Sequence, residues 1–187
     1  PAAVRLEGPL DVEVFRRALQ QVVQRQSALR VRISPEGEGG QSVMSMLHAL
    51  PVGLPYEDLS ALPEAEREGE CQRRMQRVAD TPFHLGRAPL FRAQLFKLGV
   101  EHHVFLFVGH HIAWDGASFE LLCHEMAEIY GKLSRGEEAN LPPLAVSYGD
   151  YARCAMELLT ARRGGKLPET WLMDADSAQQ ATPLSVA

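Results

Sequence analysis

The sequence predicts an α+β fold, in which helices lie against a mixed or antiparallel sheet as a two-layer sandwich. Two observations favour this class. The apolar segments 90–98 and 103–109 adjoin near Gly99, an arrangement typical of a β-hairpin. The predicted strands and helices do not alternate regularly, as they would in a doubly wound parallel sheet. At 187 residues the chain can bury a core of its own, so we expect one domain or one lobe.

The first third of the chain predicts a strand, a helix and a hairpin. Residues 4–6 form a short strand closed by Gly8, and Asp11 is a good N-cap for the helix that follows. The apolar residues of that helix recur three and four apart: Val12, Phe15, Leu19 and Val22. Residues 29–33 alternate apolar and basic side chains, so they predict a half-buried strand, with residues 41–47 as its hairpin partner.

The middle of the chain predicts a strand and a charged helix. Residues 52–56 are interpreted as the strand, and the helix begins at Ser60 and Pro63 and ends near Ala79. Its predicted inner face carries Cys71, Met75 and Val78. The charged residues between 64 and 77 then form a solvated face with i, i+4 ion pairs.

Two more helices are predicted towards the C-terminus. A long one follows Gly116, with apolar residues at helical spacing: Phe119, Leu122, Met126, Ile129 and Leu133. Ser147 and Asp150 resemble a capping box for a last helix that ends near Arg163. We therefore predict one lobe over residues 1–163 and a linker or tail over residues 164–187.

The composition argues against several classes of protein. The formal net charge is −5 and no block of Lys and Arg stands out, which argues against a nucleic-acid-binding protein. The longest apolar run, residues 104–108, is too short to cross a membrane, and no signal peptide is visible. Three widely spaced cysteines (Cys71, Cys123 and Cys154) favour buried thiols over disulfides or metal ligands. We therefore expect a soluble cytoplasmic protein with neither a membrane nor a nucleic-acid partner.

The most informative feature is the histidine pair at the end of the second apolar strand. If the strand persists through His110 and His111, their imidazoles point to opposite faces of the sheet, so only one can reach a given cavity. An imidazole titrates near neutral pH and can accept a proton from an attacking amine or hydroxyl. Asp115 could be a catalyst or the N-cap of the next helix, and Gly116 permits close backbone approach or a positive φ.

From the residues alone, the pair could be an acid/base site at a strand-to-helix turn, or it could contain ordinary core histidines. A metal site is not predicted, because adjacent histidines on a strand diverge and no H-E-x-x-H or C-x-x-C motif accompanies them. These alternatives stay open until a longer pattern is considered.

Four stretches together carry a family resemblance. Residues 110–116, HHIAWDG, resemble the HHxxxDG motif of the condensation-domain superfamily, which includes epimerisation domains and chloramphenicol acetyltransferase-like acyltransferases. Residues 25–30, RQSALR, resemble RHExLR without its His-Glu pair. Residues 81–92 are similar to PFDL…PLxR, and residues 148–152 to YxDFA, in the expected order. The chain is thereby identified as a member of the condensation domains of nonribosomal peptide synthetases.

The resemblance implies a chloramphenicol acetyltransferase-like fold and formation of a peptide bond. The α-amine of an acceptor attacks the thioester of a donor, and carrier domains deliver both substrates on phosphopantetheine arms. The domain itself would bind no cofactor and no metal. His111 is implied as the active-site residue, either a general base or a positioning group, and His110 as its inward structural neighbour.

The resemblance also implies roles for three residue types around the histidines. Asp115 would form a buried ion pair with Arg25, with Arg30 close by, instead of acting as a catalyst. Gly116 would keep the backbone close to the reacting centre, where an amide N–H could stabilise the tetrahedral oxyanion.

The resemblance covers only the N-terminal lobe of such a domain. We expect the family's first motif, SxAQxRxW, to lie before residue 1, and the C-terminal lobe to be absent from the chain. His111 should then be exposed beside an uncovered apolar interface, and the chain should be inactive without the second lobe. Three alternatives remain: an epimerisation domain, an ester-forming acyltransferase, and a non-catalytic module that docks carrier domains.

Overall fold

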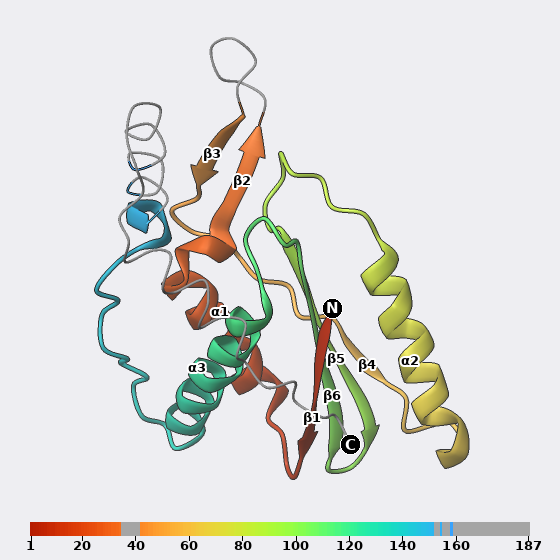
Figure 1. The fold of residues 1–187 in the computed structure, drawn as a ribbon. Coiled ribbons are helices and arrows are strands. Elements are labelled where there is room, and N and C mark those ends of the chain that lie inside the picture. Colours follow the sequence, from red (N-terminus) through yellow and green to blue (C-terminus); the bar gives the residue numbers. More distant parts are fainter. Residues whose placement is uncertain (35–41, 152–153, 155–157, 159–187) are drawn as a thin grey trace, which may run out of the picture. The chain divides into compact units, whose positions relative to one another are not determined.

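The structure is a computed structural model that describes residues 1–34, 42–151, 154 and 158. The chain divides into two compact units, residues 1–149 and 150–187, and the elements labelled in Figure 1 lie in the first. In the part of the chain that the structure describes, each helix is too short or too polar to cross a lipid bilayer.

A mixed four-stranded sheet forms the centre of the first unit (Figure 1). Its strands lie in the order β1-β6-β5-β4, with the bounds Ala2–Glu7 for β1, His102–Gly109 for β6, Phe91–Gly99 for β5 and Tyr56–Asp58 for β4. β6 pairs antiparallel with both β1 and β5, whereas β4 pairs parallel with β5. The predicted hairpin of β5 and β6 is confirmed.

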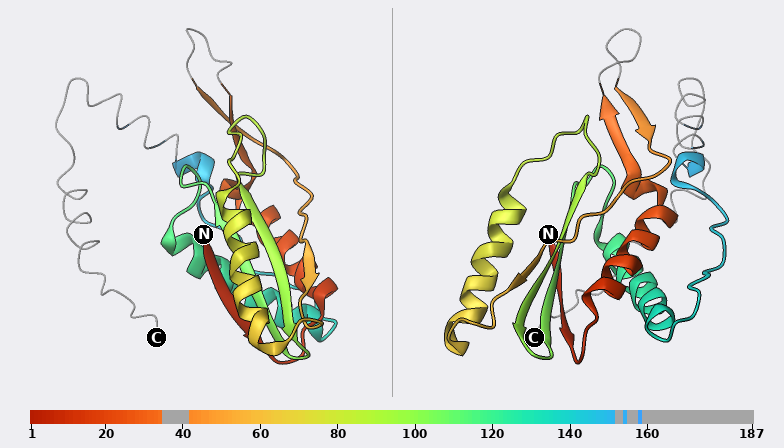
Figure 2. Two further views of the ribbon diagram at one scale, coloured as in Figure 1. Left: turned by 90° about the vertical axis from the view of Figure 1, so that its right-hand side faces the viewer. Right: turned by 180° about the vertical axis from the view of Figure 1, so that it is seen from behind.

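Helices cover both faces of this sheet, as the two rotated views show (Figure 2). Helices α1 (Val12–Arg25) and α3 (Gly116–Ser134) pack on one face, and α2 (Glu64–Asp80) packs on the other. The predicted class, a mixed sheet packed against helices, is confirmed, and α2 adds cover on the second face. The reason is the apolar character of β5 and β6, which are buried along almost their whole length and therefore need cover on both sides.

The residues of β6 alternate between the two cores. Phe105 and Phe107 face α1 and α3, where Phe15 meets Phe105 edge to face at 5.1 Å between ring centroids. Val104, Leu106 and Val108 face α2 and pack with Phe96, Leu98 and Cys71. This alternation holds the end of β6 rigidly between two packed layers.

A separate two-stranded hairpin consists of β2 (Val31–Ser34) and β3 (Val43–Met46). The predicted hairpin is confirmed, but the prediction that its first strand begins at residue 29 is wrong. Residues 27–30 form a 3-10 helix, and the strand starts at Val31. The cause is Arg30, whose buried guanidinium donates to the carbonyl of Val23 at 3.0 Å and to that of His48 at 2.9 Å. These bonds hold residue 30 in a turn.

The predicted strand over residues 52–56 is also displaced in the structure. The observed strand β4 begins at Tyr56, and pairing with β5 starts where the carbonyl of Pro55 accepts from the amide of Leu95 at 2.9 Å. Pro55 has no N–H to donate to a ladder, and the amide of Val52 donates to the side chain of Gln20 at 2.8 Å instead of to a strand.

The helices begin and end close to the predicted residues. Asp11 caps α1 as expected, because its carboxylate accepts from the amides of Glu13 and Val14 at 2.9 and 3.0 Å. The predicted last helix is present at residues 148–151, 154 and 158, and the remainder of it lies outside the described residues. The tail predicted over residues 164–187 also lies outside them, so the domain boundary stays a prediction.

One buried histidine lies far from the histidine pair. His103, near the start of β6, is 5% exposed, and its Nδ1 atom has no hydrogen-bond partner among the described residues. Burial lowers the pKa of this imidazole, helped by the charge of Lys97, while Asp58 acts in the opposite direction and His102 lowers the pKa slightly further. His103 is therefore a neutral residue of the core.

We expect His103 to make the fold less stable in acid. Its pKa is lower in the folded than in the unfolded chain, so the unfolded chain binds the proton first as the pH falls below about 6.5. Stability is then lost below that pH, with an upper bound of about 2 kcal/mol at pH 5 if the buried ring never charges. Urea unfolding at pH 7.5 and pH 5 should show a smaller difference for His103→Leu than for the wild type. The exposed His84, changed to leucine, is the matched control, and equal pH dependence in all three proteins would contradict the assignment.

Candidate active site

The histidine pair lies in a turn directly after β6. The ladder with β5 ends at the pair Phe91–Gly109. The amide of His110 then donates to the carbonyl of Leu90 at 2.9 Å, and residues 110–113 form a turn. The strand ends at Gly109, as the predicted range 103–109 has it, so the condition under which the two imidazoles would alternate across a strand is not met. The turn, and not the pleat of the sheet, sets where the two imidazoles lie.

His111 is exposed, and within the described residues its ring makes one hydrogen bond. Its Nδ1 atom lies 3.1 Å from the carbonyl oxygen of Trp114. A carbonyl oxygen only accepts, so Nδ1 carries the proton, and in the neutral ring Nε2 keeps its lone pair. The geometry thus presents Nε2 as a proton acceptor at the surface of the lobe.

His110 is half-buried and has the opposite tautomer. The amide of Ile112 donates to its Nδ1 atom at 3.1 Å, so Nδ1 must be unprotonated and the ring proton sits on Nε2. A second bond closes the same turn, from the amide of Ala113 to the carbonyl of His110 at 3.0 Å. His110 therefore shapes the turn from which His111 projects.

Asp115 is the N-cap of α3. Its Oδ1 atom accepts from the amide of Ser118 at 2.9 Å and from the Ser118 hydroxyl at 2.6 Å, and the amide of Asp115 donates back to that hydroxyl at 3.3 Å. These bonds from the side chain and backbone of Ser118 lower the pKa of the Asp115 carboxyl. The carboxylate is exposed, so the capping alternative from the sequence is the one observed.

The predicted ion pair between Asp115 and Arg25 is not formed. Arg25 instead donates to Glu125 at 2.8 Å, and Gln26 donates to both oxygens of the same carboxylate at 2.9 Å. Glu125 lies ten residues beyond Asp115, about 15 Å further along α3, where α1 and α3 pack together. Its side chain is only 7% exposed, so it needs these partners more than the exposed Asp115 does.

Arg30 also fails to meet Asp115. Its guanidinium donates to the backbone carbonyls of Val23, Leu47 and His48, which join the end of α1 to the segment after β3. Within the described residues its role is to satisfy buried backbone acceptors, and no ion pair with a carboxylate is observed.

The glycine with a steric role is Gly109, and sequence reasoning missed it. A Cβ atom on Gly109 would lie 2.5 Å from Cγ of Trp114, whereas one on Gly116 would meet no atom of the described residues within 4 Å. Gly116 also has no positive φ. Among the described residues, neither a close neighbour nor the backbone conformation therefore requires a glycine at this position. A lone glycine at the end of an apolar strand was the available signal, since it indicates a close neighbour.

Trp114 occupies the space that Gly109 leaves free. Its ring packs on Phe107 at 4.3 Å between centroids and meets Phe119 edge to face at 6.3 Å. Trp114 thereby joins the end of β6 to the start of α3 and places its own carbonyl next to His111. Trp114, at one of the x positions of HHxxxDG, is thus a structural anchor in this chain.

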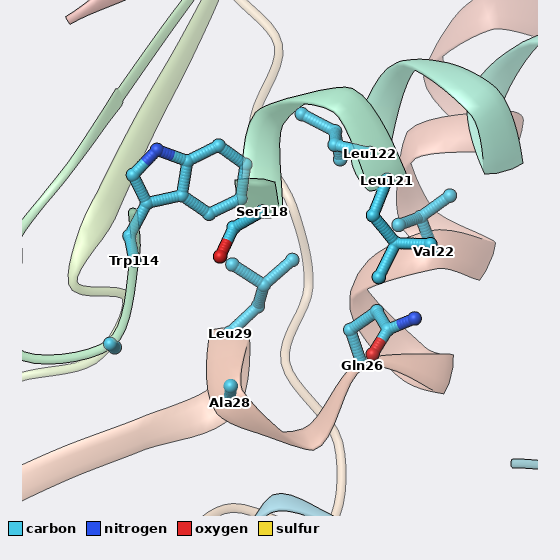
Figure 3. Close-up of a pocket in the computed structure, with 9 residues that line it drawn as sticks. Val22, Gln26, Ala28, Leu29, Trp114, Ser118, Leu121 and Leu122 are labelled. Atoms are coloured by element: carbon cyan, nitrogen blue, oxygen red, sulfur yellow. The ribbon is translucent and has the colours of Figure 1, made fainter. Parts of the chain in front are cut away.

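A small pocket lies beside this anchor, between α1 and α3 (Figure 3). It is mostly apolar and measures about 60 Å³, and Trp114 and Ser118 line one side while Leu29 and Val22 line the other. Ligand pockets for drug-sized molecules are about 300–1,000 Å³, so this one is too small for an aminoacyl substrate. His111 does not line it, and a substrate would have to lie on the open surface over His111.

Apolar side chains are exposed on the elements around that surface. Ile112, adjacent to His111, is 41% exposed, and Leu121 on α3 is 48% exposed. The predicted exposure of His111 next to uncovered apolar residues is thus observed.

The chain belongs to the condensation-domain family, since the profile described as "Condensation domain" matches residues 1–185. It is 37% identical over 171 residues to tyrocidine synthase 3 of Brevibacillus parabrevis, and the match covers 91% of this chain and 2% of that protein. It is 35% identical over 153 residues to chondramide synthase cmdD of Chondromyces crocatus, covering 82% of this chain and 4% of that protein. The chain thus spans only a small part of the length of these relatives.

Solved structures show the same fold. The first condensation domain of the calcium-dependent antibiotic synthetase, in complex with a substrate analogue, superposes with a TM-score of 0.75 at 32% identity, covering 85% of this chain and 37% of that one. The X-domain in its complex with OxyB from teicoplanin biosynthesis superposes with a TM-score of 0.75 at 29% identity, covering 87% and 34%. The chain therefore spans little more than a third of the length of these solved domains. The predicted family and fold are confirmed.

Proposed function

We propose that this chain is the N-terminal lobe of a condensation domain in a nonribosomal peptide synthetase, and that the complete domain forms an amide bond. The donor is an aminoacyl or peptidyl thioester and the acceptor is an α-amine, each carried on the phosphopantetheine of a carrier domain. The observation that carries the proposal is the exposed His111, whose Nε2 lone pair is free because Nδ1 is bound to the carbonyl of Trp114. The lobe binds no cofactor of its own in this proposal.

The proposed reaction needs one proton acceptor and no nucleophilic side chain. Nε2 of His111 accepts the proton of the acceptor amine as its nitrogen attacks the thioester carbonyl carbon. The oxyanion that forms then collapses, the C–S bond breaks, and the leaving thiolate takes the proton back from the imidazolium. The products are an amide and a free phosphopantetheine thiol, so atoms and charges balance.

Residues around His111 have supporting roles in this proposal. His110 holds the turn by accepting from the amide of Ile112. Gly116 is the first residue of α3, and the first amides of a helix have no partner within it, so in this proposal its N–H stabilises the oxyanion. Asp115 and the pair formed by Arg25 and Glu125 hold α3 and α1 in place and take no part in proton transfer.

The lobe should act only together with a second one. Ile112 and Leu121 are exposed close to a pocket too small for the substrate, so a further lobe has to supply the rest of the binding surface. A second candidate function is a docking module without catalysis, which is favoured by the complex of the similar X-domain with OxyB.

The test is an assay with two carrier proteins, each loaded with an aminoacyl group on phosphopantetheine. The chain joined to the rest of its condensation domain should form the dipeptidyl thioester, detected by mass spectrometry, and the chain alone should not. A product formed only with a hydroxyl acceptor would indicate an ester-forming acyltransferase. Exchange of the donor α-proton without coupling would indicate an epimerisation domain. Binding of carrier protein with no product from the complete domain would support docking alone.

A further inference from the structure

A single arginine holds the segment between α2 and β5. Arg92, the second residue of β5, donates from its two terminal nitrogens to the carbonyls of Thr81 and Pro82, each at 2.7 Å. Its guanidinium carbon also lies 3.9 Å from the centre of the Phe83 ring. One guanidinium therefore contacts three consecutive residues, two through their carbonyls and one through its aromatic face.

The charge of Arg92 has an unusual environment. Within residues 1–34 and 42–151, it makes no ion pair with a carboxylate, and burial lowers the pKa of the guanidinium. Two carbonyls and a π face thus replace the usual acidic partner. Such an arrangement depends on the planar fork of arginine, which can bind two carbonyls and cover a ring at once.

Phe83 connects this clamp to the histidine pair. Its ring meets the imidazole of His110 edge to face, with 5.9 Å between the centroids and 86° between the planes. Phe83 therefore lies between Arg92 and the residue that shapes the turn before His111. The backbone bond from His110 to Leu90 ties the same turn to the residue before β5.

We infer that Arg92 is a positioning residue that acts through Phe83 on His110 and thereby sets the orientation of the 110–113 turn and of His111. The guanidinium orders the backbone of residues 81 and 82, and Phe83 then offers His110 a fixed surface. The effect on catalysis rests on the proposed function, whereas the effect on the imidazole of His110 does not.

If Arg92 had only a structural role, its loss would have a different effect on His110. Thr81 also closes α2, because its hydroxyl donates to the carbonyl of Arg77 at 2.9 Å. If Arg92 served only to anchor the end of α2, its loss would lower stability and leave the imidazole of His110 unchanged. The state of His110 therefore separates positioning from anchoring.

The first measurement is the ¹⁵N spectrum of the imidazoles in the 187-residue chain. We expect Arg92→Met and Phe83→Leu each to move the two ring nitrogens of His110 towards each other, because Nδ1 gains and Nε2 loses proton occupancy as the ordered tautomer gives way to a mixture. The double variant should shift them no further, because the two residues act in series. Arg92→Lys keeps the charge but not the fork, so it should give a smaller shift, and it also serves if Arg92→Met does not fold. Arg77→Met on the exposed face of α2 is the matched control and should leave the signals in place.

The second measurement is turnover by the complete domain with loaded carrier proteins. Each single change should lower kcat about tenfold with little change in KM, and the double change should also cost about tenfold. Unchanged His110 signals, or additive losses that reach about a hundredfold in the double variant, would overturn the inference. If the wild-type domain forms no amide, the proposed function fails, and the spectra alone still decide whether Arg92 and Phe83 position His110.

Discussion

Replacing His111 by alanine should reduce kcat for amide formation by the complete domain about 10²–10⁴-fold, the usual contribution of a general base. The loss follows from removal of the only exposed imidazole nitrogen of the pair that has a free lone pair. KM for the acceptor carrier should change little, because carrier binding does not depend on Nε2. Steady-state rates with saturating carriers measure the effect.

The matched control is His102→Ala, at the exposed opposite end of β6. It removes the same type of side chain at the start of β6, far from the turn that carries His111, and should retain wild-type turnover. A His111→Ala domain that keeps more than about half of the wild-type kcat would contradict the assignment of His111 as the base, given the size expected for general-base catalysis.

Replacing Arg25 by methionine should lower the free energy of unfolding by about 3 kcal/mol. The buried carboxylate of Glu125 then keeps only the amide of Gln26 as a partner, and an unpaired buried charge is costly. The value is at the low end for a broken buried ion pair, since Arg25 is 20% exposed and Gln26 still donates to both oxygens. Urea unfolding at neutral pH measures it.

Two further variants show whether Glu125 is the partner of Arg25. Arg25→Met combined with Glu125→Gln removes the unpaired charge and should recover much of the loss, by about 1–2 kcal/mol. Asp115→Asn keeps the N-cap and should cost less than about 1 kcal/mol. A large loss of stability in Asp115→Asn, together with no recovery in the double variant, would indicate that Arg25 pairs with Asp115 and not with Glu125.

Local patterns in the sequence were sufficient for most of the fold. The cap at Asp11 and the hairpin of β5 and β6 depend on neighbouring residues, so spacing alone predicts them. The layer added by α2 was not predicted, although the run of apolar residues in β6 indicates burial on both faces. The predicted strand boundaries were wrong where a distant carbonyl or a proline decided the backbone pairing, as at residues 29–33 and 52–56.

The candidate site could be predicted only in part for the same reason. Arg25 and Glu125 are 100 residues apart, and nothing in the local pattern of either says that they meet. The contact of Gly109 with Trp114 likewise depends on how the turn after β6 closes. Exposure of His111 was expected, but its tautomer follows only from the position of the Trp114 carbonyl.

The central claim is that the turn after β6 holds the two histidines in opposite tautomers, with Nε2 of His111 free. Long-range ¹H–¹⁵N correlation of the imidazoles at about pH 8, where an ordinary histidine is neutral, tests this most directly. We predict a protonated Nδ1 and an unprotonated Nε2 for His111, and the reverse for His110. A His111 ring that carries its proton on Nε2 would contradict the account, because no lone pair would then face the surface where the amine is to be deprotonated.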